Sequence, residues 1–309
     1  MKLGSAAVDG VLDRVQLRRA PGRPSQLHLS VTDRCFLPCV HCDIWKNKTP
    51  DLPTEPWEDL IDRLADWCAP AGMNFVGGEP LLRKDLESLM ARAVRRGFEV
   101  SFNTNGHLLT AQRAEAIHRA GVSKAYVSLD GIRKETIDHS RGRRGSLEKA
   151  MAAIDLMQTQ GTPRVVIACI LHAGNVEEIP ELLQFVRSRG IQVVFQPLYQ
   201  NFGEVVHDPD WWRDSALWPH ERASREALDD CLDMLSVTRL RGGPVCNSIE
   251  QLQAMKSYFA RPDQDARQLC RAGHSDLSFD PRGQIRLCYF LEPVGSIFDA
   301  TPLPVQWSS

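Results

Sequence analysis

Three cysteines close together are the residues of this chain with the most definite chemistry. Cys35, Cys39 and Cys42 lie in the stretch SVTDRCFLPCVHCDIW, separated by three and then by two residues. Cysteine thiolates are the usual protein ligands of iron–sulfur clusters, and a [4Fe–4S] cluster has four irons. Three thiolates on one loop therefore predict a [4Fe–4S] cluster whose fourth iron is left for another ligand.

Two other uses of these cysteines stay open. A structural zinc site commonly takes paired CxxC or Cys/His sets, and this loop offers only His41 as a fourth ligand. A disulfide framework is typical of short secreted chains, whereas this chain has 309 residues and nine cysteines, an odd number that leaves at least one unpaired. The spacing favours the iron–sulfur cluster over both.

The bulk composition is that of an ordinary globular protein. The chain has 43% hydrophobic and 25% charged residues and a formal net charge of −2, and its length predicts about two domains. A near-neutral charge argues against a protein that binds nucleic acid through many phosphate contacts. No run of eighteen apolar residues is present, and the first twenty residues lack the apolar core of a secretory signal. We expect a cytoplasmic protein with no membrane or nucleic-acid partner.

Six short β-rich runs alternate with amphipathic helical patterns along the first two thirds of the chain. Glycines such as Gly97 and Gly121 stand where the helical patterns end. This alternation predicts a parallel sheet, and six units are fewer than the eight that close a complete βα barrel. We therefore predict an α/β fold with a partial, TIM-like (β/α)6 barrel. The six runs are LHLSV (27–31), MNFV (73–76), FEVSF (98–102), AYVSL (125–129), VVIACI (165–170) and QVVFQ (192–196).

Polar segments follow four of the predicted strands, which is where barrel enzymes place their active sites. The cysteine loop follows the first strand, and Gly77-Gly78-Glu79-Pro80 follows the second. Asn103-Thr104-Asn105-Gly106 comes after the third, and Ser128-Leu129-Asp130-Gly131 comes after the fourth. Glycines allow a backbone to approach a ligand closely. The C-terminal edge of the sheet is therefore the predicted site.

Together, the CxxxCxxC loop and these segments resemble the radical S-adenosylmethionine (radical SAM) enzymes. The resemblance implies that the methionine moiety of S-adenosylmethionine chelates the open iron and that Glu79 and the adjacent backbone contact its amino group. His139-Ser140-Arg141-Gly142 is similar to another family segment and implies that Arg141 neutralises the methionine carboxylate. His41 stands where the family has an aromatic residue near the adenine. The implied cofactor-binding residues are His41, Gly77, Gly78, Glu79, Asn105, Ser128, Asp130 and Arg141.

The last quarter of the chain carries a second group of cysteines. Two helical stretches, about 219–240 and 248–259, precede Cys270, and a predicted β-hairpin around residues 281–283 leads to Cys288. The pattern resembles the SPASM and twitch extensions of radical SAM enzymes, which hold auxiliary iron–sulfur clusters, and it implies Cys270 and Cys288 as further metal ligands. No cysteine follows Cys288. The chain is then truncated, or its extension is incomplete, or Cys246 is a third ligand; a pair of buried thiols in a small hairpin is the alternative.

The predicted organisation follows from these patterns. Residues 1–24 form an N-terminal segment, 25–200 the radical SAM core barrel, 201–260 a helical connection, and 261–309 the SPASM-like or twitch-like extension.

The resemblance implies an oxidoreductase-like enzyme that cleaves S-adenosylmethionine reductively and uses the 5′-deoxyadenosyl radical to abstract hydrogen. The expected substrate is a peptide or a small molecule, which is modified oxidatively, and the expected electron donor is a flavodoxin or ferredoxin. A redox-neutral radical SAM epimerase, in which Cys246 returns hydrogen to the substrate, is one alternative. A non-catalytic iron–sulfur or zinc binding module is the other. No residue is predicted to be catalytic, although His172, Gln196 and Tyr199 lie at strand ends that face the cavity.

Overall fold

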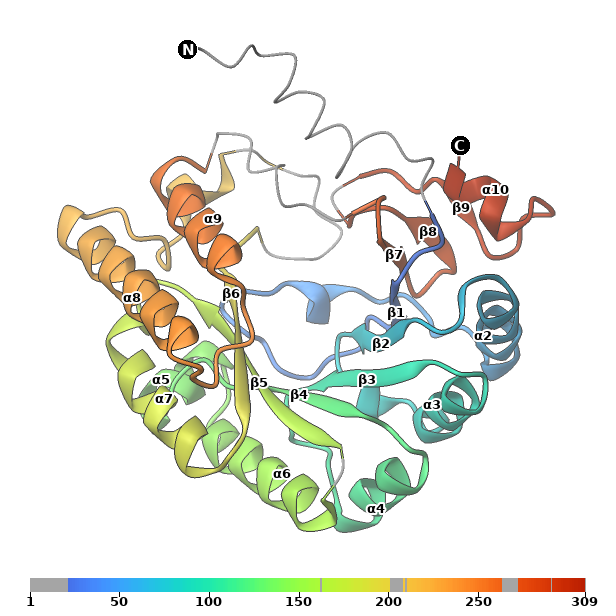
Figure 1. Ribbon diagram of the computed structural model, residues 1–309, viewed down its shortest axis with the longest axis horizontal. Helices are drawn as coiled ribbons and strands as arrows, with labels where there is room; N and C mark the ends of the chain where they lie inside the picture. The colour runs from blue at the N-terminus through green and yellow to red at the C-terminus, as the bar shows by residue number, and fades with distance from the viewer. Residues whose placement is uncertain are drawn as a thin grey trace.

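Six parallel strands followed by helices form the body of the molecule. The computed structural model describes residues 22–161, 163–200, 208, 210–262, 272–289 and 291–308, the side chains of 305, 306 and 308 excepted. Helices lie outside the curved sheet, around its convex face (Figure 1). The strands are β1 (Gln26–Thr32), β2 (Gly72–Gly77), β3 (Glu99–Thr104), β4 (Lys124–Ser128), β5 (Arg164–Leu171) and β6 (Gln192–Pro197).

The helices fall between the strands, as the alternation predicts. The connections contain α2 (Thr54–Cys68), α3 (Leu86–Arg95), α4 (Ala111–Arg119), α5 (Lys134–Ser140), α6 (Ser146–Gln160) and α7 (Ile179–Ser188), with short 3-10 turns η2 (Ile44–Lys46), η3 (Pro80–Leu82) and η4 (Val176–Glu178). After β6 come η5 (Trp211–Asp214), α8 (Arg222–Leu240) and α9 (Ile249–Ala260), which confirm the two helical stretches predicted there. The chain continues with β7 (Asp276–Phe279), β8 (Gln284–Arg286), β9 (Gly295–Ser296) and α10 (Leu303–Ser308). Among the helices of the described residues, none is both long and apolar enough to span a bilayer.

The sheet is an open barrel. Its strand order is β6-β5-β4-β3-β2-β1-β7-β8-β9, and β1 to β6 pair in parallel. Over the described residues β6 does not pair with β9, so the sheet does not close. The prediction of an α/β partial barrel is thereby confirmed.

The predicted hairpin is present, and it is joined to the main sheet. β7 and β8 pair antiparallel across a turn in which Gly283 has φ +78° and its N–H donates to the carbonyl of Asp280 at 2.9 Å. β7 also pairs in parallel with β1, with Leu277 opposite Leu27. The hairpin therefore extends the sheet beyond β1.

The two faces of the strands differ in chemistry. On β1 to β4 the side chains that point toward the helices are apolar and buried, for example Leu29, Phe75 and Phe102. The alternate positions, on the concave face, carry polar side chains: His28, Ser30, Asn74, Ser101, Asn103 and Tyr126. The interior of a complete βα barrel is normally filled by Val, Ile and Leu. This concave face is polar instead.

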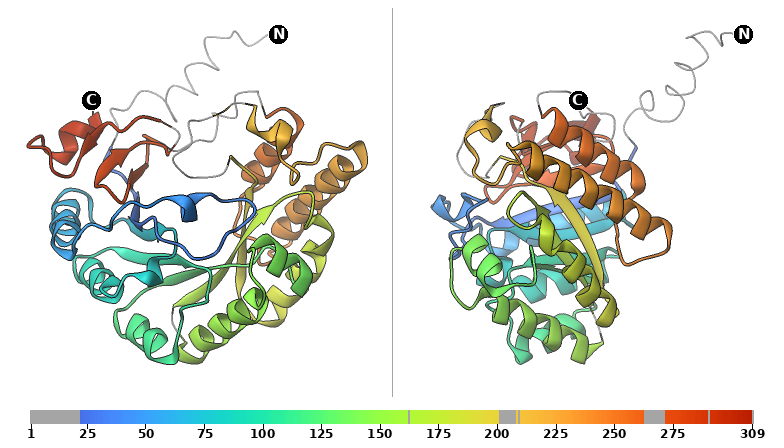
Figure 2. Two further views of the ribbon diagram at one scale, coloured as in Figure 1. Left: turned by 180° about the vertical axis from the view of Figure 1, so that it is seen from behind. Right: turned by 90° about the vertical axis from the view of Figure 1, so that its left-hand side faces the viewer.

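The outer edge of β6 is covered by the segment between α8 and α9. The N–H of Val193 donates to the carbonyl of Pro244 at 2.9 Å, and the N–H of Cys246 donates to the carbonyl of Val193 at 2.8 Å. The Asn247 side chain then continues the ladder, because its Oδ1 accepts from the N–H of Phe195 at 2.7 Å and its Nδ2 donates to the carbonyl of Phe195 at 2.9 Å. The edge groups of β6 are thus satisfied. Figure 2 shows α8 and α9 side by side next to β6.

Candidate functional site

The cysteine loop leaves the C-terminal end of β1 and passes over the edge of the sheet. Cys35, Cys39 and Cys42 are half-buried and unpaired. The N–H of Cys42 donates to the carbonyl of Cys39 at 3.2 Å, which turns the chain between these two ligands. The N–H of Val40 donates to the carbonyl of Ser140 at 3.0 Å and fixes the loop to the end of α5. All three thiols are therefore presented on one short, anchored loop.

The thiols lie close enough to interact electrostatically. Burial raises the pKa of Cys35 to about 11 and that of Cys42 to about 12, and the neighbouring cysteines of the loop raise both further. Burial also raises the pKa of Cys39, but the Arg141 guanidinium, which hydrogen-bonds to its side chain, opposes that rise. Within the part of the chain that the structure describes, no three His, Cys, Asp or Glu side chains converge on a single metal ion. Burial and mutual repulsion disfavour the thiolate forms of these cysteines. Bound irons would stabilise the thiolates, so the loop fits an iron–sulfur cluster.

Gly77, the last residue of β2, and Gly78 lie so close to the backbone at the start of the cysteine loop that neither position has room for a side chain. The N–H of Gly78 donates to the carbonyl of Thr32, and the N–H of Glu79 donates to the carbonyl of Arg34, both at 2.8 Å. A Cβ on Gly77, where φ is +133°, would lie 2.2 Å from the Thr32 carbonyl oxygen, and a Cβ on Gly78 would lie 2.4 Å from that of Arg34. The close approach that these glycines allow is therefore to the backbone of the cysteine loop.

Glu79 joins two of the site's loops. Its side chain is fully buried, and its carboxylate accepts from the N–H of Leu81 at 3.1 Å, the hydroxyl of Thr104 at 2.9 Å and the N–H of Asn105 at 2.8 Å. Burial raises its pKa to about 7 against these hydrogen bonds, which lower it. A carboxylate has about four acceptor positions, so one is left for a ligand. Thr104 lies in the Asn-Thr-Asn-Gly segment but is not among the predicted site residues, and the structure shows it holding Glu79.

Asp130 and Arg141 form a buried ion pair beside Cys39. An Arg141 guanidinium nitrogen lies 2.6 Å from Oδ2 of Asp130, which also accepts from the Ser140 hydroxyl at 3.0 Å. The other carboxylate oxygen accepts from the N–H of Ile170 at 3.0 Å. Burial alone would raise the pKa of Asp130, but the charge of Arg141 and the surrounding donors outweigh it and lower the pKa. Asp130 therefore orients Arg141, whose buried Nε has no hydrogen-bond partner.

Two buried histidines leave ring nitrogens without a partner near this ion pair. His41 Nδ1 and His172 Nε2 are both buried and find no partner among the described residues, and the two rings interact electrostatically with each other and with Asp130 and Arg141. Burial lowers the pKa of His41 to about 4 and also lowers that of His172. The N–H of Gly174 donates to Nδ1 of His172 at 3.0 Å, so the neutral ring carries its proton on Nε2. Buried polar atoms of this kind are usually hydrogen-bonded, and their grouping here favours a ligand.

Other predicted residues lie along the same edge of the sheet. The side chain of Asn105 accepts from the N–H of His107 at 3.0 Å, and half-buried Ser128 is the last residue of β4. Asn175, which the sequence prediction did not include, donates to the carbonyls of Asp130 at 2.6 Å and Ile170 at 2.7 Å. Asn175 stands just before η4, but its side chain does not cap that helix. The structure thus brings the predicted cofactor-binding residues to one edge of the sheet. Their contacts with a ligand remain a prediction.

Of the cysteines in the last quarter of the chain, the structure describes Cys246 and Cys288 but not Cys270. Cys270 lies outside the described residues, and Cys288 is unpaired and half-buried, with its carbonyl accepting from the N–H of Leu291 at 3.1 Å. Cys246 pairs with the beginning of β6, and its charged neighbours include Lys124 and Arg164, the first residues of β4 and β5. It therefore lies toward the N-terminal ends of the strands, away from the edge that carries the cysteine loop.

Comparison with known proteins places these features in a family. The model of the radical SAM superfamily matches residues 29–186, slightly more than half of the chain. The chain is 37% identical over 223 residues to the Fe-coproporphyrin III synthase of Methanosarcina barkeri, covering 70% of this chain and 52% of that protein. It is 31% identical over 170 residues to the PqqA peptide cyclase of Granulibacter bethesdensis, covering 54% of this chain and 45% of that one. The chain spans about half the length of these curated relatives.

Solved structures share the fold. Streptococcus suis SuiB bound to S-adenosylmethionine superposes with a TM-score of 0.68 at 16% identity, covering 93% of this chain and 66% of that one. Native anSMEcpe with bound AdoMet and the Cp18Cys peptide superposes with a TM-score of 0.67 at 18% identity, covering 92% and 80%. The family match ends at residue 186, so the likeness of the C-terminal quarter to SPASM and twitch extensions stays a prediction.

Proposed function

Because the chain belongs to the radical SAM superfamily, we propose that it is an enzyme that cleaves S-adenosylmethionine reductively and oxidises a peptide or small-molecule substrate. A [4Fe–4S] cluster and S-adenosylmethionine are the cofactors of this superfamily. The observation that carries the proposal is the joint placement of three free thiols, the buried Arg141–Asp130 pair and unpartnered buried nitrogens at one edge of the sheet.

A cluster held by the three cysteines would supply the electron for reductive cleavage of S-adenosylmethionine, and that cleavage would provide the hydrogen-abstracting chemistry. The chain's own part is to bind, to orient and to exclude water. Cys35, Cys39 and Cys42 would hold three irons, and their loop is fixed by the glycines after β2 and by the carbonyl of Ser140. That anchoring keeps the three thiolates in one arrangement.

Arg141 would bind the carboxylate of the methionine moiety. Its guanidinium is buried and is held by Asp130 at 2.6 Å, and its Nε is free to donate. A guanidinium presents five N–H donors, so one group can bind Asp130 and a second carboxylate together. Three hydrogen bonds from the chain, one of them from Arg141 itself, hold the Asp130 carboxylate, so its proposed role is to position Arg141.

Glu79 would accept from the amino group of the methionine moiety with its remaining acceptor position. Three hydrogen bonds already hold this carboxylate, so its direction is set before a ligand arrives. Cys35 lies within the electrostatic field of Glu79. Glu79 and Cys35 would therefore act on the same end of the cofactor.

The substrate class is a proposal drawn from the relatives. Their names describe synthesis of an iron porphyrin, cyclisation of the PqqA peptide and cyclisation of GTP, so both peptides and small molecules are represented. We infer a flavodoxin or ferredoxin as the electron donor. Residues 25–200 would form the catalytic core, 201–260 a helical connection and 261–309 an extension that holds an auxiliary cluster through Cys270 and Cys288. The position of Cys246 near the N-terminal ends of the strands speaks against its use as a hydrogen donor in an epimerase.

The test is anaerobic reconstitution with iron and sulfide, followed by dithionite and S-adenosylmethionine, with 5′-deoxyadenosine quantified. We expect the product from the parent chain and from the Cys246→Ala control, and none from a Cys35/Cys39/Cys42→Ala variant. Intact S-adenosylmethionine in a protein fully loaded with iron would overturn the proposal and favour a non-catalytic binding module.

A further inference from the structure

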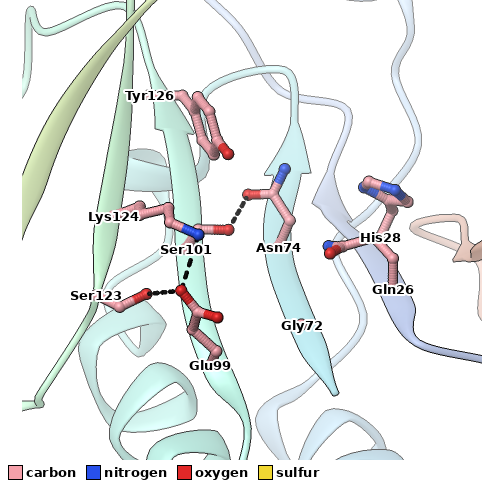
Figure 3. Close-up of a pocket in the computed structure, with 9 residues that line it drawn as sticks. All are labelled: Gln26, His28, Gly72, Asn74, Glu99, Ser101, Ser123, Lys124 and Tyr126. Carbon is pink, nitrogen blue, oxygen red and sulfur yellow. Dashed lines mark hydrogen bonds and ion pairs between the residues drawn. The ribbon is translucent and has the colours of Figure 1, made fainter. Parts of the chain in front are cut away.

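A cavity of about 140 Å³ lies on the concave face of the sheet, at the N-terminal ends of β1 to β4. Its walls include Gln26 from β1, Asn74 from β2, Ser101 from β3, and Lys124 and Tyr126 from β4. Figure 3 shows these side chains pointing into a common space above Gly72. Along β2, three residue steps separate Asn74 in the cavity wall from Gly77 beside the start of the cysteine loop, which is about 10 Å at roughly 3.3 Å per residue. It is therefore distinct from the cofactor site.

The polar side chains of the cavity are held in fixed directions by one another. The Ser101 hydroxyl donates to Oδ1 of Asn74 at 3.1 Å, and Nδ2 of Asn74 donates to Oδ1 of Asn103 at 3.1 Å. This chain of hydrogen bonds sets the orientation of the Asn74 carboxamide and leaves one of its N–H groups and the lone pairs of the Ser101 oxygen for a ligand. The cavity thus offers a donor and an acceptor on adjacent strands.

The charged groups around the cavity are paired with one another. Lys124 Nζ lies 2.8 Å from a carboxylate oxygen of Glu99, and His28 Nε2 lies 3.5 Å from a carboxylate oxygen of Asp276. Lys124 and Glu99 are the fixed charges among the side chains that line the cavity, and they offset each other, so the lining itself has no net fixed charge. A neutral ligand is therefore the better match.

The tyrosine adds a flat apolar surface next to the polar groups. In Figure 3 the Tyr126 ring stands above Ser101 and Asn74, with its hydroxyl directed toward Asn74. Burial raises the pKa of Tyr126, so its hydroxyl stays protonated and can both donate and accept. An aromatic ring beside hydrogen-bonding groups can pack against the carbon backbone of a ligand.

We propose that this cavity is a binding site for a small uncharged polyol. Each hydroxyl of a polyol donates and accepts, which matches the mixed set of donors and acceptors on β2, β3 and β4. The carbon chain of the polyol packs on the Tyr126 ring. A water takes about 30 Å³ in the liquid, so the cavity has room for a ligand of several non-hydrogen atoms. The site is separate from the proposed radical chemistry and does not depend on it.

Ligand-observed NMR titrations of the reconstituted full chain with glycerol and with acetate test the proposal. We expect saturable glycerol binding by the parent chain and no comparable binding of acetate. Tyr126→Phe and Ser101→Ala each remove a hydrogen-bonding group, and each should weaken glycerol binding about fivefold. Tyr258→Phe is the matched control, because that hydroxyl bonds to the carbonyl of Leu198 outside the cavity, and it should bind glycerol as the parent does.

Gly72→Ala tests the cavity by a steric change that we expect to leave the fold intact. A Cβ on Gly72 would lie 2.3 Å from the flexible end of the Gln26 side chain, so Gly72→Ala would move that carboxamide and alter the cavity while the backbone stays in place. We expect weakened glycerol binding with an unchanged circular dichroism spectrum. Glycerol binding that is equal in the parent and all three cavity variants, or acetate binding tighter than glycerol, would overturn the proposal. Formation of 5′-deoxyadenosine is measured separately, so a failure here leaves the proposed radical chemistry untouched.

Discussion

The two ends of the same strands are built in opposite ways. At the C-terminal edge, Glu79 and Asp130 are completely buried, and the chain's own donors surround both carboxylates. At the N-terminal end, Glu99 and Lys124 pair while their side chains are 56% and 31% exposed. Solvent weakens an exposed pair, whereas a buried one is costly to disrupt. The comparison teaches that the buried carboxylates of the site edge depend on donors from the chain and that the exposed charges of the opposite end do not.

The largest expected difference between the ends comes from removing an arginine. Arg141→Met leaves Asp130 buried without its counter-charge, which costs about 3–5 kcal/mol of unfolding free energy. Arg164→Met removes only an exposed contact of 3.9 Å with Glu99 and should change stability by less than about 0.5 kcal/mol. Urea unfolding of the cluster-free chain, followed by circular dichroism, measures both. Similar losses for the two variants would remove the distinction between the ends.

The second comparison uses pH. Burial raises the pKa of Glu79 from 4.5 to about 7, so between these values the folded chain keeps a proton that the unfolded chain has lost. Stability should therefore fall as pH rises through this window, by up to about 3 kcal/mol. Glu79→Gln should remove that part of the slope in unfolding experiments at a series of pH values.

Glu99 supplies the control of opposite sign. Lys124 lowers the pKa of Glu99, so its contribution is present above the unfolded pKa and is lost as pH falls through the folded pKa. Glu99→Gln should therefore reduce stability at neutral pH and leave it unchanged in acid. A Glu79→Gln variant with the parent's full pH slope would show that the buried carboxylate is not the group that titrates.

The smallest expected effect compares Gly72, the first residue of β2, with Gly78, the residue that follows β2. A Cβ on Gly78 would meet the backbone carbonyl of Arg34, which cannot move without the cysteine loop, so Gly78→Ala should cost about 1–3 kcal/mol. A Cβ on Gly72 would meet only the end of the Gln26 side chain, and that variant should stay close to the parent in stability. Thermal unfolding of both variants checks the ranking. A Gly72→Ala chain that is the less stable of the two would contradict it.

Much of the fold follows from the local pattern. Each of the six β-rich runs overlaps a strand of the structure, although the ends move by a residue or two; the fourth run, predicted at 125–129, is Lys124–Ser128. Strand ends depend on pairing with neighbours, which a single run does not contain. The hairpin near Gly283 follows from its turn residues, whereas its parallel pairing with β1 depends on contacts some 250 positions apart in sequence, between Leu27 and Leu277.

The site follows the same rule. The positions of Glu79, Asp130 and Arg141 after their strands could be predicted from the sequence, because the C-terminal ends of parallel strands share one edge. The hydrogen-bond partners of each side chain could not be predicted in this way. The groups that hold each carboxylate come from other parts of the sheet: the N–H of Ile170 on β5 reaches Asp130, and the N–H of Asn105 after β3 reaches Glu79.

The Asn247 carboxamide at the edge of β6 has a consequence for self-association. Its oxygen and nitrogen occupy both hydrogen-bonding groups of Phe195, so a strand from another molecule finds no free donor or acceptor there. The Asn247 side chain therefore ends strand pairing beside Phe195, and the sheet stops there without closing into a ring. At Phe195 the edge of the sheet is terminated by side-chain hydrogen bonds rather than by curvature.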